Sequence, residues 1–378
     1  MRIFINALSA RQGGGQTYLR YLFEGVAEIG SATIYLVAPD SLELPERVEN
    51  VERLRVRWPV TNPITRWVWE RYGLPAVLEK LRVDVLFCPG GLINTVPRGG
   101  CKTATMFRNM VPFDLEQRRR YPLGYMRMRN WILEKVMLRS MIDANLVIFV
   151  SKYAKTVIEQ RAGRRLRRTA VIPHGISADF QTFQHEVEPK RPGWLPEGDY
   201  FLYVSTFDFY KAQIEVIRGY ALLREMRNTP EKLVLVGAEN PAYGRKLRKQ
   251  IDRLGVEDAV LLVGFVPHSD LPGAYCNATV NIFASECENC PNILLEAMAA
   301  GGPLVVSNRQ PMPEFGGDAV VYFDPSSPQN FAETVSALVD NPGAREQLSL
   351  KAQERSRLYQ WETSARETWR CLENLASA

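Results

Sequence analysis

The feature that most constrains the fold of this chain is an alternation of short apolar runs with longer helical patterns, which occurs twice. In the first half, strand-like runs rich in Val, Ile and Phe are expected at 2–6, 33–37, 84–88, 103–107, 145–150 and 169–173. Helical patterns lie between them near 15–29, 65–81, 123–142 and 151–162. Short strands that are apolar throughout are typical of parallel sheets covered on both faces.

A break separates the two rounds of alternation. The segment that starts at His185, HEVEPKRPGWLPEGD, contains three prolines and two glycines, so it is interpreted as a linker over 186–199. Strands are then expected at 200–205, 232–236, 259–263, 279–283, 303–306 and 319–322. Helices are expected near 211–227, 241–254, 291–300 and 328–340, and a last helical stretch over 344–376 with a break near Gln360.

Repeated β–α units of this length predict an α/β protein with two doubly wound, Rossmann-like domains facing each other. The expected boundaries are 1–185 for the first domain and 200–360 for the second. In such sheets ligands bind beyond the carboxyl ends of the strands, so functional residues should follow strands and face an interdomain cleft.

Charge is divided unevenly between the halves. Residues 1–180 carry 28 Lys/Arg and 16 Asp/Glu, a net charge of +12, whereas residues 181–378 carry a net charge of −7. The basic half should attract an anionic surface or substrate, but no nucleic-acid-binding motif accompanies the charge. No apolar run approaches the ~20 residues of a membrane span, and six cysteines make no disulfide framework, so a reduced cytoplasmic setting is expected.

The glycine run 13–15 follows the first expected strand and precedes a helix expected near Gln16. Backbone N–H groups of such a run can approach an anion at a helix N-terminus, but a flexible turn explains the run equally well. The full dinucleotide pattern G-x-G-x-x-G is absent.

The most informative stretch is residues 285–301, SECENCPNILLEAMAAG, in which seven residues separate Glu288 from Glu296. Pro291 suits the first turn of a helix, and the free N–H groups that follow would point at an anion. These N–H groups belong to Asn292, Ile293 and Leu294. Both carboxylates could face one ligand; taken alone, two surface glutamates around a capped helix are the commoner case.

This stretch closely resembles the Glu-x7-Glu signature of family 4 retaining glycosyltransferases, which have the GT-B fold. Further segments resemble the family in its order, at 171–177, 203–211, 233–237, 263–266, 313–325 and 361–365. The resemblance implies two Rossmann-like domains, with the C-terminal helix, about 361–378, packing back on the first.

The resemblance also implies roles for the residues of the second domain. Glu296 would bind the ribose of a nucleotide-sugar, and Glu288 would contact the transferred sugar. Lys211 would offset the negative charge of the diphosphate, for which an ammonium suffices. The remaining donor contacts would come from Ser205, Thr206, the amides of 292–294, and the backbone of Phe265 and Val266. Gly14 and Gly15 would lie across the cleft, near the diphosphate and the acceptor.

Two positions depart from the family pattern. Thr206 stands where an Arg usually provides a second diphosphate cation. Either Arg11 or another basic residue across the cleft compensates, or the leaving group is stabilised less. Asn109 stands where many members carry a His near the reacting sugar, and Arg108 beside it is a spare phosphate ligand. Asn can hydrogen-bond a sugar hydroxyl but cannot act as a general base. This is compatible with a mechanism in which the leaving phosphate deprotonates the acceptor.

Two other patterns are weighed against ordinary structural roles. Cys287 and Cys290 form a C-x-x-C, but no second pair and no suitably spaced histidines complete a zinc site, so no metal is expected. The segment 118–139 is basic, with Trp131 and methionines interleaved, and five arginines lie in 161–168. Such a helix could lie on anionic lipid, or it could be a core-facing helix with a wet basic side.

The predicted function is therefore transfer of a sugar, with retention, from a nucleoside-diphosphate donor to a glycan or lipid-linked glycan. The resemblance implies no cofactor and no metal, and a place in the cytoplasm or on the inner face of the membrane. The residues leave UDP, GDP and ADP donors open. A nucleotide-sugar 2-epimerase and a non-catalytic sugar- or lipid-binding relative are the alternatives.

Overall fold

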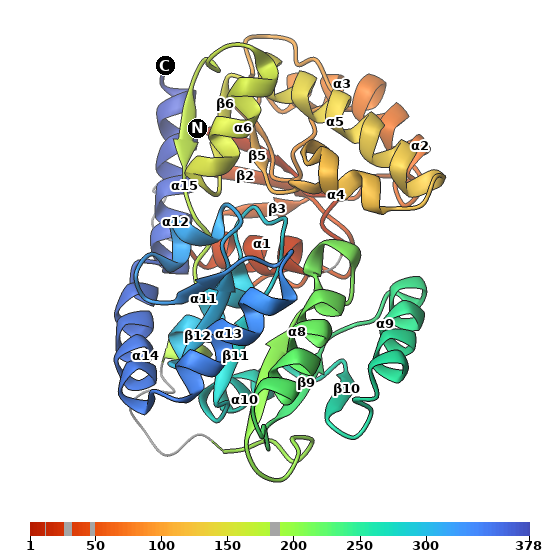
Figure 1. The fold of residues 1–378 in the computed structure, drawn as a ribbon. Coiled ribbons are helices and arrows are strands. Elements are labelled where there is room, and N and C mark those ends of the chain that lie inside the picture. Colours follow the sequence, from red (N-terminus) through yellow and green to blue (C-terminus); the bar gives the residue numbers. More distant parts are fainter. Residues whose placement is uncertain (12, 26–31, 46–49, 182–189) are drawn as a thin grey trace. The chain divides into compact units, whose positions relative to one another are not determined.

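The computed structural model describes residues 1–11, 13–25, 32–45, 50–181 and 190–378 (Figure 1). The chain forms two compact units. The first contains residues 1–113, 123–175 and 360–378, and the second contains 114–122 and 176–359.

The first unit is built on a seven-stranded parallel sheet in the order β3-β2-β1-β4-β5-β6-β7. Its strands are β1 (Arg2–Asn6), β2 (Thr33–Val37), β3 (Val51–Arg53), β4 (Val85–Cys88), β5 (Lys102–Phe107), β6 (Leu146–Phe149) and β7 (Thr169–Val171). The central strand β1 pairs with β2 on one side and β4 on the other, and its residues 3–5 are fully buried. Burial on both faces explains why inner strands such as β4 and β6 are continuous apolar runs.

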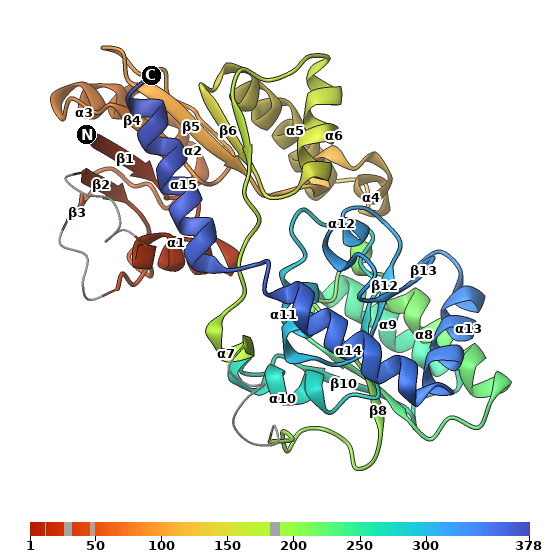
Figure 2. The ribbon, with the colours of Figure 1, turned by 90° about the vertical axis from the view of Figure 1, so that its left-hand side faces the viewer.

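Helices cover this sheet. They are α1 (Gly14–Glu24), α2 (Pro63–Val68), the π-helix η2 (Trp69–Gly73), α3 (Leu74–Lys80), the 3-10 helix η3 (Val111–Phe113), α5 (Tyr125–Asp143), α6 (Lys152–Ala162) and α15 (Trp361–Ala376). Figure 2 shows α15, in blue, lying against α1. Trp369 of α15 is buried and donates its indole N–H to the carbonyl of Leu22 at 2.8 Å, so the end of the chain completes this core.

The second unit contains a six-stranded parallel sheet in the order β10-β9-β8-β11-β12-β13. Its strands are β8 (Tyr200–Val204), β9 (Lys232–Val236), β10 (Val260–Gly264), β11 (Val280–Phe283), β12 (Leu304–Ser307) and β13 (Val321–Phe323). Strand β8 lies between β9 and β11 and is buried throughout.

The helical segments of this unit are α4 (Leu115–Arg120), α7 (Ala178–Gln181), η5 (Phe209–Lys211), α8 (Gln213–Met226), α9 (Pro241–Leu254), η6 (His268–Asp270), α10 (Leu271–Cys276), α11 (Asn292–Ala300), α12 (Met312–Gly316), α13 (Pro328–Val339) and α14 (Pro342–Ser356). Sequence-encoded caps set several boundaries. Asn240 accepts a hydrogen bond from the N–H of Ala242 at the start of α9, and Gly255 ends that helix in the left-handed conformation.

The alternation predicted the α/β class and almost every long element. The break expected near Gln360 is confirmed, since α14 ends at Ser356 and α15 begins at Trp361. Strand β3 was not predicted because the sequence Val-Glu-Arg at a sheet edge carries no apolar run. Of the expected linker 186–199, residues 186–189 lie outside the described part, and 190–199 contain neither helix nor strand.

One segment is grouped differently from its place in the sequence. Residues 114–122 lie within the first expected domain in chain order, but their contacts group them with the second unit. The chain leaves the first unit at Asp114 and returns to it at Leu123. The cause is a set of polar contacts that α4 makes with the loops of the second sheet.

Candidate functional site

The second sheet reverses its winding direction between β8 and β11. From β8 the chain continues outward to β9 and β10, whereas from β11 it continues to β12 and β13 on the other side. The loops that follow β8 and β11 therefore diverge at the carboxyl ends of the two strands, which is where sheets of this kind bind ligands. Residues 205–211 follow β8 and residues 284–291 follow β11, so both predicted donor-binding segments lie at this switch point.

Lys211 and Glu288 form an ion pair at this switch point. The Lys211 ammonium lies 2.5 Å from a carboxylate oxygen of Glu288, and their side chains are only 7% and 14% exposed. The 3-10 turn that carries Lys211 is fixed at both ends, since Asp208 accepts from the N–H of Phe209 and Tyr203 donates to the Lys211 carbonyl. A shielded, opposite-charge pair on fixed loops presents a cation to an anionic ligand and an acceptor to hydroxyl groups.

The neighbours of the pair remain protonated at neutral pH. Burial, followed by the charge of Glu288, raises the pKa of the Tyr203 and Tyr210 phenols above their usual range. Burial also raises the pKa of the Cys287 thiol, with Asp114 and Glu288 adding to the shift. These groups can donate hydrogen bonds, but they are poor bases at neutral pH.

Glu296 lies on α11 with its side chain 18% exposed, and its carboxylate is 3.2 Å from the Nε2 atom of His268. The ring of Phe180 lies edge-on to that imidazole at 5.0 Å. His268 comes two residues after Val266, so this contact joins Glu296 to the segment predicted to hold the base. Within that segment Phe265 is 81% exposed and Val266 is buried.

The start of α11 corrects one prediction. Pro291 is the residue before the helix, with φ −82° and ψ 74°, and not part of its first turn. The N–H of Asn292 donates to the Cys290 carbonyl at 3.0 Å, so it is not free for an anion. The tight turn at Pro291 causes this bond. The backbone N–H groups of Ile293 and Leu294 remain candidates for hydrogen bonds to an anion.

Thr206 and Ser205 follow β8 as predicted. Ser205 is buried, whereas Thr206 is exposed and its carbonyl accepts from the Gln213 amide at 2.9 Å. The Thr206 side chain supplies no positive charge at the position where the resemblance implies an Arg. Lys211 is therefore the cation that this loop offers.

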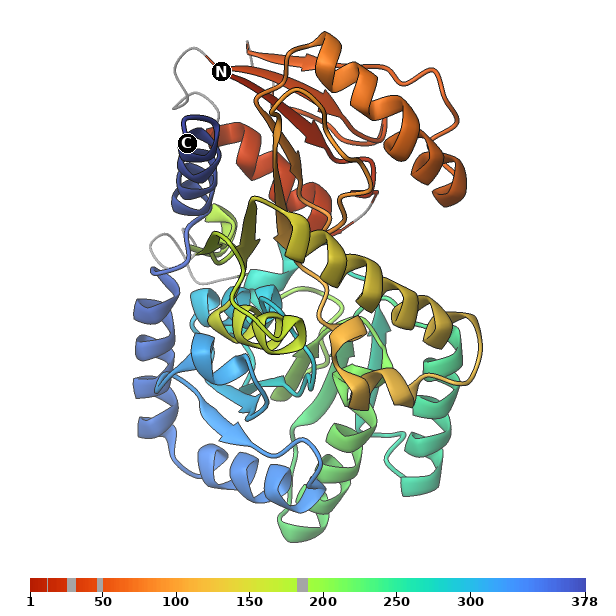
Figure 3. The ribbon, with the colours of Figure 1, turned by 90° about the horizontal axis from the view of Figure 1, so that it is seen from above.

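Sequence reasoning missed a brace formed by α4, the short gold helix that precedes the longer α5 along the chain in Figure 3. Arg120 makes a two-pronged ion pair with Glu286, whose side chain is 2% exposed, and Tyr121 donates to the Asp208 carboxylate at 3.1 Å. Glu286 itself donates its backbone N–H to the Tyr210 carbonyl at 2.8 Å. The brace thus contacts both loops that carry Lys211 and Glu288. The run of three arginines was the available signal, but its partners are far away in sequence.

The first sheet has its own switch point, between β1 and β4. Gly13, with φ +64°, starts α1 at Gly14, two residues before the expected start. Arg108 donates to the Gly14 carbonyl at 2.5 Å. A pocket of about 350 Å³ brings together residues of the β1, β4 and β5 loops with α5, among them Ser9, Gly15, Gly90, Arg66, Arg108, Asn109 and Arg129. The predicted Gly15 and Asn109 are thus neighbours, with three guanidinium groups around them.

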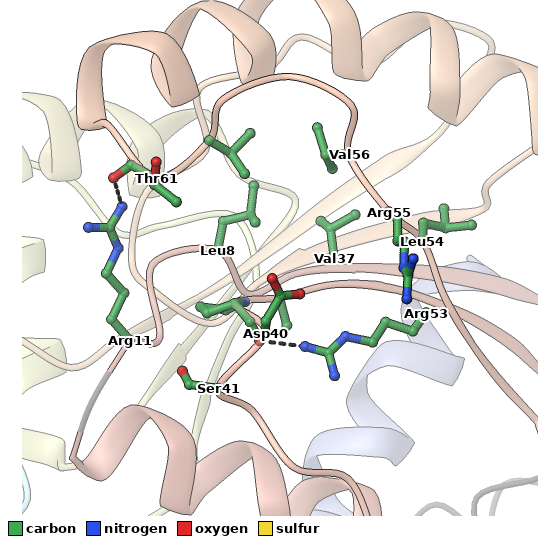
Figure 4. A pocket seen from close by; sticks show the side chains of 13 residues that line it. Leu8, Arg11, Val37, Asp40, Ser41, Arg53, Leu54, Arg55, Val56 and Thr61 are labelled. Carbon is green, nitrogen blue, oxygen red and sulfur yellow. Dashed lines mark hydrogen bonds between the residues drawn. The ribbon is translucent and has the colours of Figure 1, made fainter.

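A larger pocket of about 900 Å³ lies beyond the carboxyl ends of β1, β2 and β3 (Figure 4). Its polar lining includes Arg11, Asp40, Ser41, Arg53 and Arg55. Arg11 donates to the carbonyl of Thr61, and Arg53 donates to the carbonyl of Leu42 at 3.0 Å. Arg11 lines this pocket, whereas Arg66, Arg108 and Arg129 line the smaller pocket that contains Gly15 and Asn109.

Three further features of the described residues concern metal ligands, the C-x-x-C pair and helices long enough to span a membrane. Among them no group of three or more His, Cys, Asp or Glu side chains is arranged to hold a metal ion. Cys287 is buried, Cys290 is half-buried, and both are reduced cysteines. No described helix is both long and apolar enough to cross a bilayer.

Comparison with known proteins identifies the family. The profile described as "Glycosyltransferase Family 4" matches residues 12–180, and the one described as "Glycosyl transferases group 1" matches residues 184–355. The chain belongs to these glycosyltransferases. The two matched regions fall on the two successive α/β halves, and the fold is GT-B, as the resemblance of residues 285–301 implied.

Individual relatives share only a small part of their sequence with this chain. The O-antigen chain mannosyltransferase B of Escherichia coli is 25% identical over 238 residues, which is 62% of this chain and 62% of that protein. Anabaena HepE bound to UDP and glucose has a TM-score of 0.70 at 18% identity, covering 99% of both chains. WaaG, a glycosyltransferase involved in lipopolysaccharide biosynthesis, has a TM-score of 0.70 at 14% identity, covering 98% of this chain and 99% of WaaG. The matched region spans about three fifths of the curated mannosyltransferase.

Proposed function

We propose that this glycosyltransferase moves a sugar from a nucleoside-diphosphate sugar to a glycan or lipid-linked glycan acceptor, with retention at the anomeric carbon. The observation that carries the proposal is the Lys211–Glu288 pair at the switch point of the second sheet. A shielded cation at that position suits a diphosphate, and Glu296 on α11 adds a carboxylate for the ribose diol.

In the proposed reaction the bond between the anomeric carbon and the diphosphate oxygen breaks. The acceptor oxygen forms its bond to the same face of the sugar, and its proton passes to the leaving phosphate. Lys211 would exchange part of its contact with Glu288 for the diphosphate and stabilise the negative charge that develops there. Glu288 would then accept hydrogen bonds from the sugar hydroxyls and hold the anomeric carbon in position. The amides of Ile293 and Leu294 would add donors at the start of α11.

The acceptor would bind to the first unit. The pocket around Gly15, Arg108 and Asn109 offers an amide for sugar hydroxyls and guanidinium groups for phosphate, and the larger pocket beside Arg53 and Arg55 has room for further sugar residues. The names of the relatives support a cell-envelope glycan, since one extends O-antigen and another acts in lipopolysaccharide biosynthesis. The proposed setting is the cytoplasmic face of a membrane, and the proposed reaction needs no metal and no cofactor.

Two experiments test this function. A thermal-shift screen of UDP-, GDP- and ADP-sugars identifies the donor, because a ligand that binds the native state raises the Tm. Proton NMR of a reaction with that donor and an envelope glycan then follows the anomeric signal. The proposal predicts nucleoside diphosphate release that depends on acceptor and a product with the donor's anomeric configuration. Isomerised donor sugar would indicate the epimerase, and binding without turnover the non-catalytic relative.

A further inference from the structure

Three guanidinium groups line one small pocket of the first unit. They belong to Arg66 in the last turn of α2, Arg108 directly after β5, and Arg129 on α5. No Asp or Glu stands among the described residues that line this pocket, so its potential is positive and indicates an anionic ligand. Its volume of about 350 Å³ lies at the lower end of ligand sites, which suits a compact charged group.

Arg66 is held in place from two sides. Its Nη1 group donates to the Leu8 carbonyl at 3.1 Å, and its Nε atom lies 4.0 Å from a carboxylate oxygen of Glu70. Burial lowers the pKa of this guanidinium, the charge of Glu70 opposes that shift, and Arg11 adds to it. A guanidinium has five N–H donors, so these contacts fix the group and leave donors for a ligand.

Glu70 is the buried support behind Arg66. It belongs to the first turn of the π-helix η2 and is only 8% exposed. One carboxylate oxygen accepts from the side-chain amide of Asn6 at 3.0 Å, and the other accepts from that of Asn94 at 2.5 Å. Asn6 ends β1, and Asn94 follows β4, so the two central strands hold the carboxylate. A buried carboxylate is costly without such bonds, and its fixed place sets where Arg66 lies.

Arg108 brings a second fixed cation to the pocket. It donates to the Gly14 carbonyl at 2.5 Å, and its guanidinium lies 5.2 Å from the centre of the Tyr18 ring. Both contacts are with α1. Arg129 is exposed on α5 and supplies the third cation. Guanidinium groups fit phosphate oxygens particularly well, because each presents parallel N–H groups that make two charged hydrogen bonds.

We propose that Arg66, Arg108 and Arg129 bind a phosphate group of the acceptor, and that Glu70 is the positioning residue for Arg66. The inference rests on the proposed function for the binding of the acceptor to the first unit, and it adds that this acceptor is a phosphate ester. Phosphorylated sugars and lipid-linked diphosphates both carry such a group, and guanidinium contacts of this kind recognise either.

Isothermal titration calorimetry of the full chain tests the site without turnover. The probes are glucose 6-phosphate and geranyl diphosphate, with glucose as the uncharged comparison. At least one ester should bind about tenfold or more tightly than glucose, and the ester that binds more tightly identifies the source of the phosphate. Arg66→Ala should raise the Kd of that ester about tenfold or more, because charged hydrogen bonds are lost. Arg66→Lys should raise it less.

Glu70→Gln separates positioning from charge. If charge alone mattered, removal of a negative charge beside Arg66 would tighten anion binding. A positioning role instead predicts binding that is about fivefold weaker. The double variant Arg66→Ala/Glu70→Gln should bind no more weakly than Arg66→Ala, because Glu70 acts through Arg66. Glu134→Gln is the matched control: it alters another buried carboxylate of the first unit, paired with Arg161 at 2.9 Å, and should leave the Kd within about twofold.

Failure of the site and failure of the proposed function give different results. An unchanged Kd in Arg66→Ala, tighter binding in Glu70→Gln, an equal loss in Glu134→Gln, or no binding of either ester would each overturn the inference. Loss of binding in Lys211→Ala would place the phosphate in the second unit and overturn it as well. Ester binding that follows the predictions without sugar transfer would refute the proposed function and leave the anion site intact. Transfer to an uncharged glycan with the same acceptor KM in Arg66→Ala would do the reverse.

Discussion

The two units share one topology but use it differently. Both are parallel sheets with a switch point near the middle, and both place polar side chains after the strands that flank it. In the second unit the charged groups are shielded and paired, as in Lys211–Glu288 and Arg120–Glu286. In the first unit arginines line open pockets, and apolar side chains of α5 face outward. The comparison suggests a second unit organised for one fixed ligand and a first unit organised for larger, more varied partners.

The largest effect is expected at the shielded pair. Lys211→Ala removes the cation that would stabilise the leaving diphosphate, so kcat should fall by about 10²–10³-fold. Initial rates of nucleoside diphosphate release measure it. Lys246→Ala, which removes an exposed lysine above the Phe209 ring, is the matched control and should change kcat less than twofold. Unchanged turnover in Lys211→Ala would remove the pair from the proposed mechanism.

A variant of Glu296 tests whether the second unit binds the nucleoside of the donor. Glu296→Ala loses the hydrogen bonds of a carboxylate to two ribose hydroxyls, so the donor KM should rise about tenfold or more while kcat changes little. Steady-state kinetics with varied donor separate the two constants. A fall in kcat at constant KM would instead place Glu296 at the reacting sugar.

The Arg120–Glu286 brace tests how strongly the two loops of the candidate site are held in place before the donor binds. Arg120→Ala leaves the Glu286 carboxylate without its partner. This should cost about 2 kcal/mol of stability, less than the ~3–5 kcal/mol of a fully buried pair because Arg120 is 29% exposed. Donor kcat/KM should fall about tenfold, since both loops lose their support.

Arg119→Ala on the same helix removes an exposed arginine and is the control. Urea unfolding and donor kinetics measure the two effects of Arg120→Ala. Arg120→Lys should retain part of the stability and part of the donor kcat/KM. Lysine keeps the positive charge but cannot make two parallel hydrogen bonds to the Glu286 carboxylate. If Arg120→Ala lowers stability but leaves the donor kcat/KM unchanged, the brace stabilises the fold and does not position the two loops for the donor.

In the first unit a smaller, acceptor-specific effect is expected. Arg108→Ala and Asn109→Ala should each raise the acceptor KM about five- to tenfold, the cost of one or two hydrogen bonds, and leave the donor KM unchanged. Kinetics with each substrate varied in turn provide the measurement. A change in donor KM alone would reverse the assignment of the two units.

The smallest effect concerns the thiols. Cys276 is exposed, whereas Cys287 is buried with a raised pKa, and burial raises the pKa of Cys101 to about 11. At pH 8 a maleimide should therefore label Cys276 before Cys101, and Cys287 more slowly than either, because the thiolate reacts and each raised pKa lowers its fraction. Mass spectrometry of timed samples measures the order. Rapid, paired modification of Cys287 and Cys290 would favour a redox role for the C-x-x-C instead.

Much of the candidate donor site could be predicted from local sequence. Lys211, Glu288 and Glu296 lie where strand–loop–helix order places them, because a parallel sheet brings the ends of its strands to one edge. The free amide expected at Asn292 was wrong, because the direction of a single N–H depends on the dihedral angles of Pro291 and not on residue type. The brace at Arg120 was missed because its partner Glu286 lies 166 residues away.

The sequence by itself determined the α/β class, the two rounds of β–α units and the family signature. Strand burial and helix capping depend on short-range patterns of apolar and capping residues. Tertiary structure decided which side of α5 faces outward. The sequence left a lipid-facing helix and a core-facing helix open. The burial of Met137 and Met141, together with the contact of Glu134 with Arg161, accompanies the orientation that exposes Trp131. The physical reason is that a helix rotates to satisfy its buried polar groups, whose partners lie on elements that are distant in the chain.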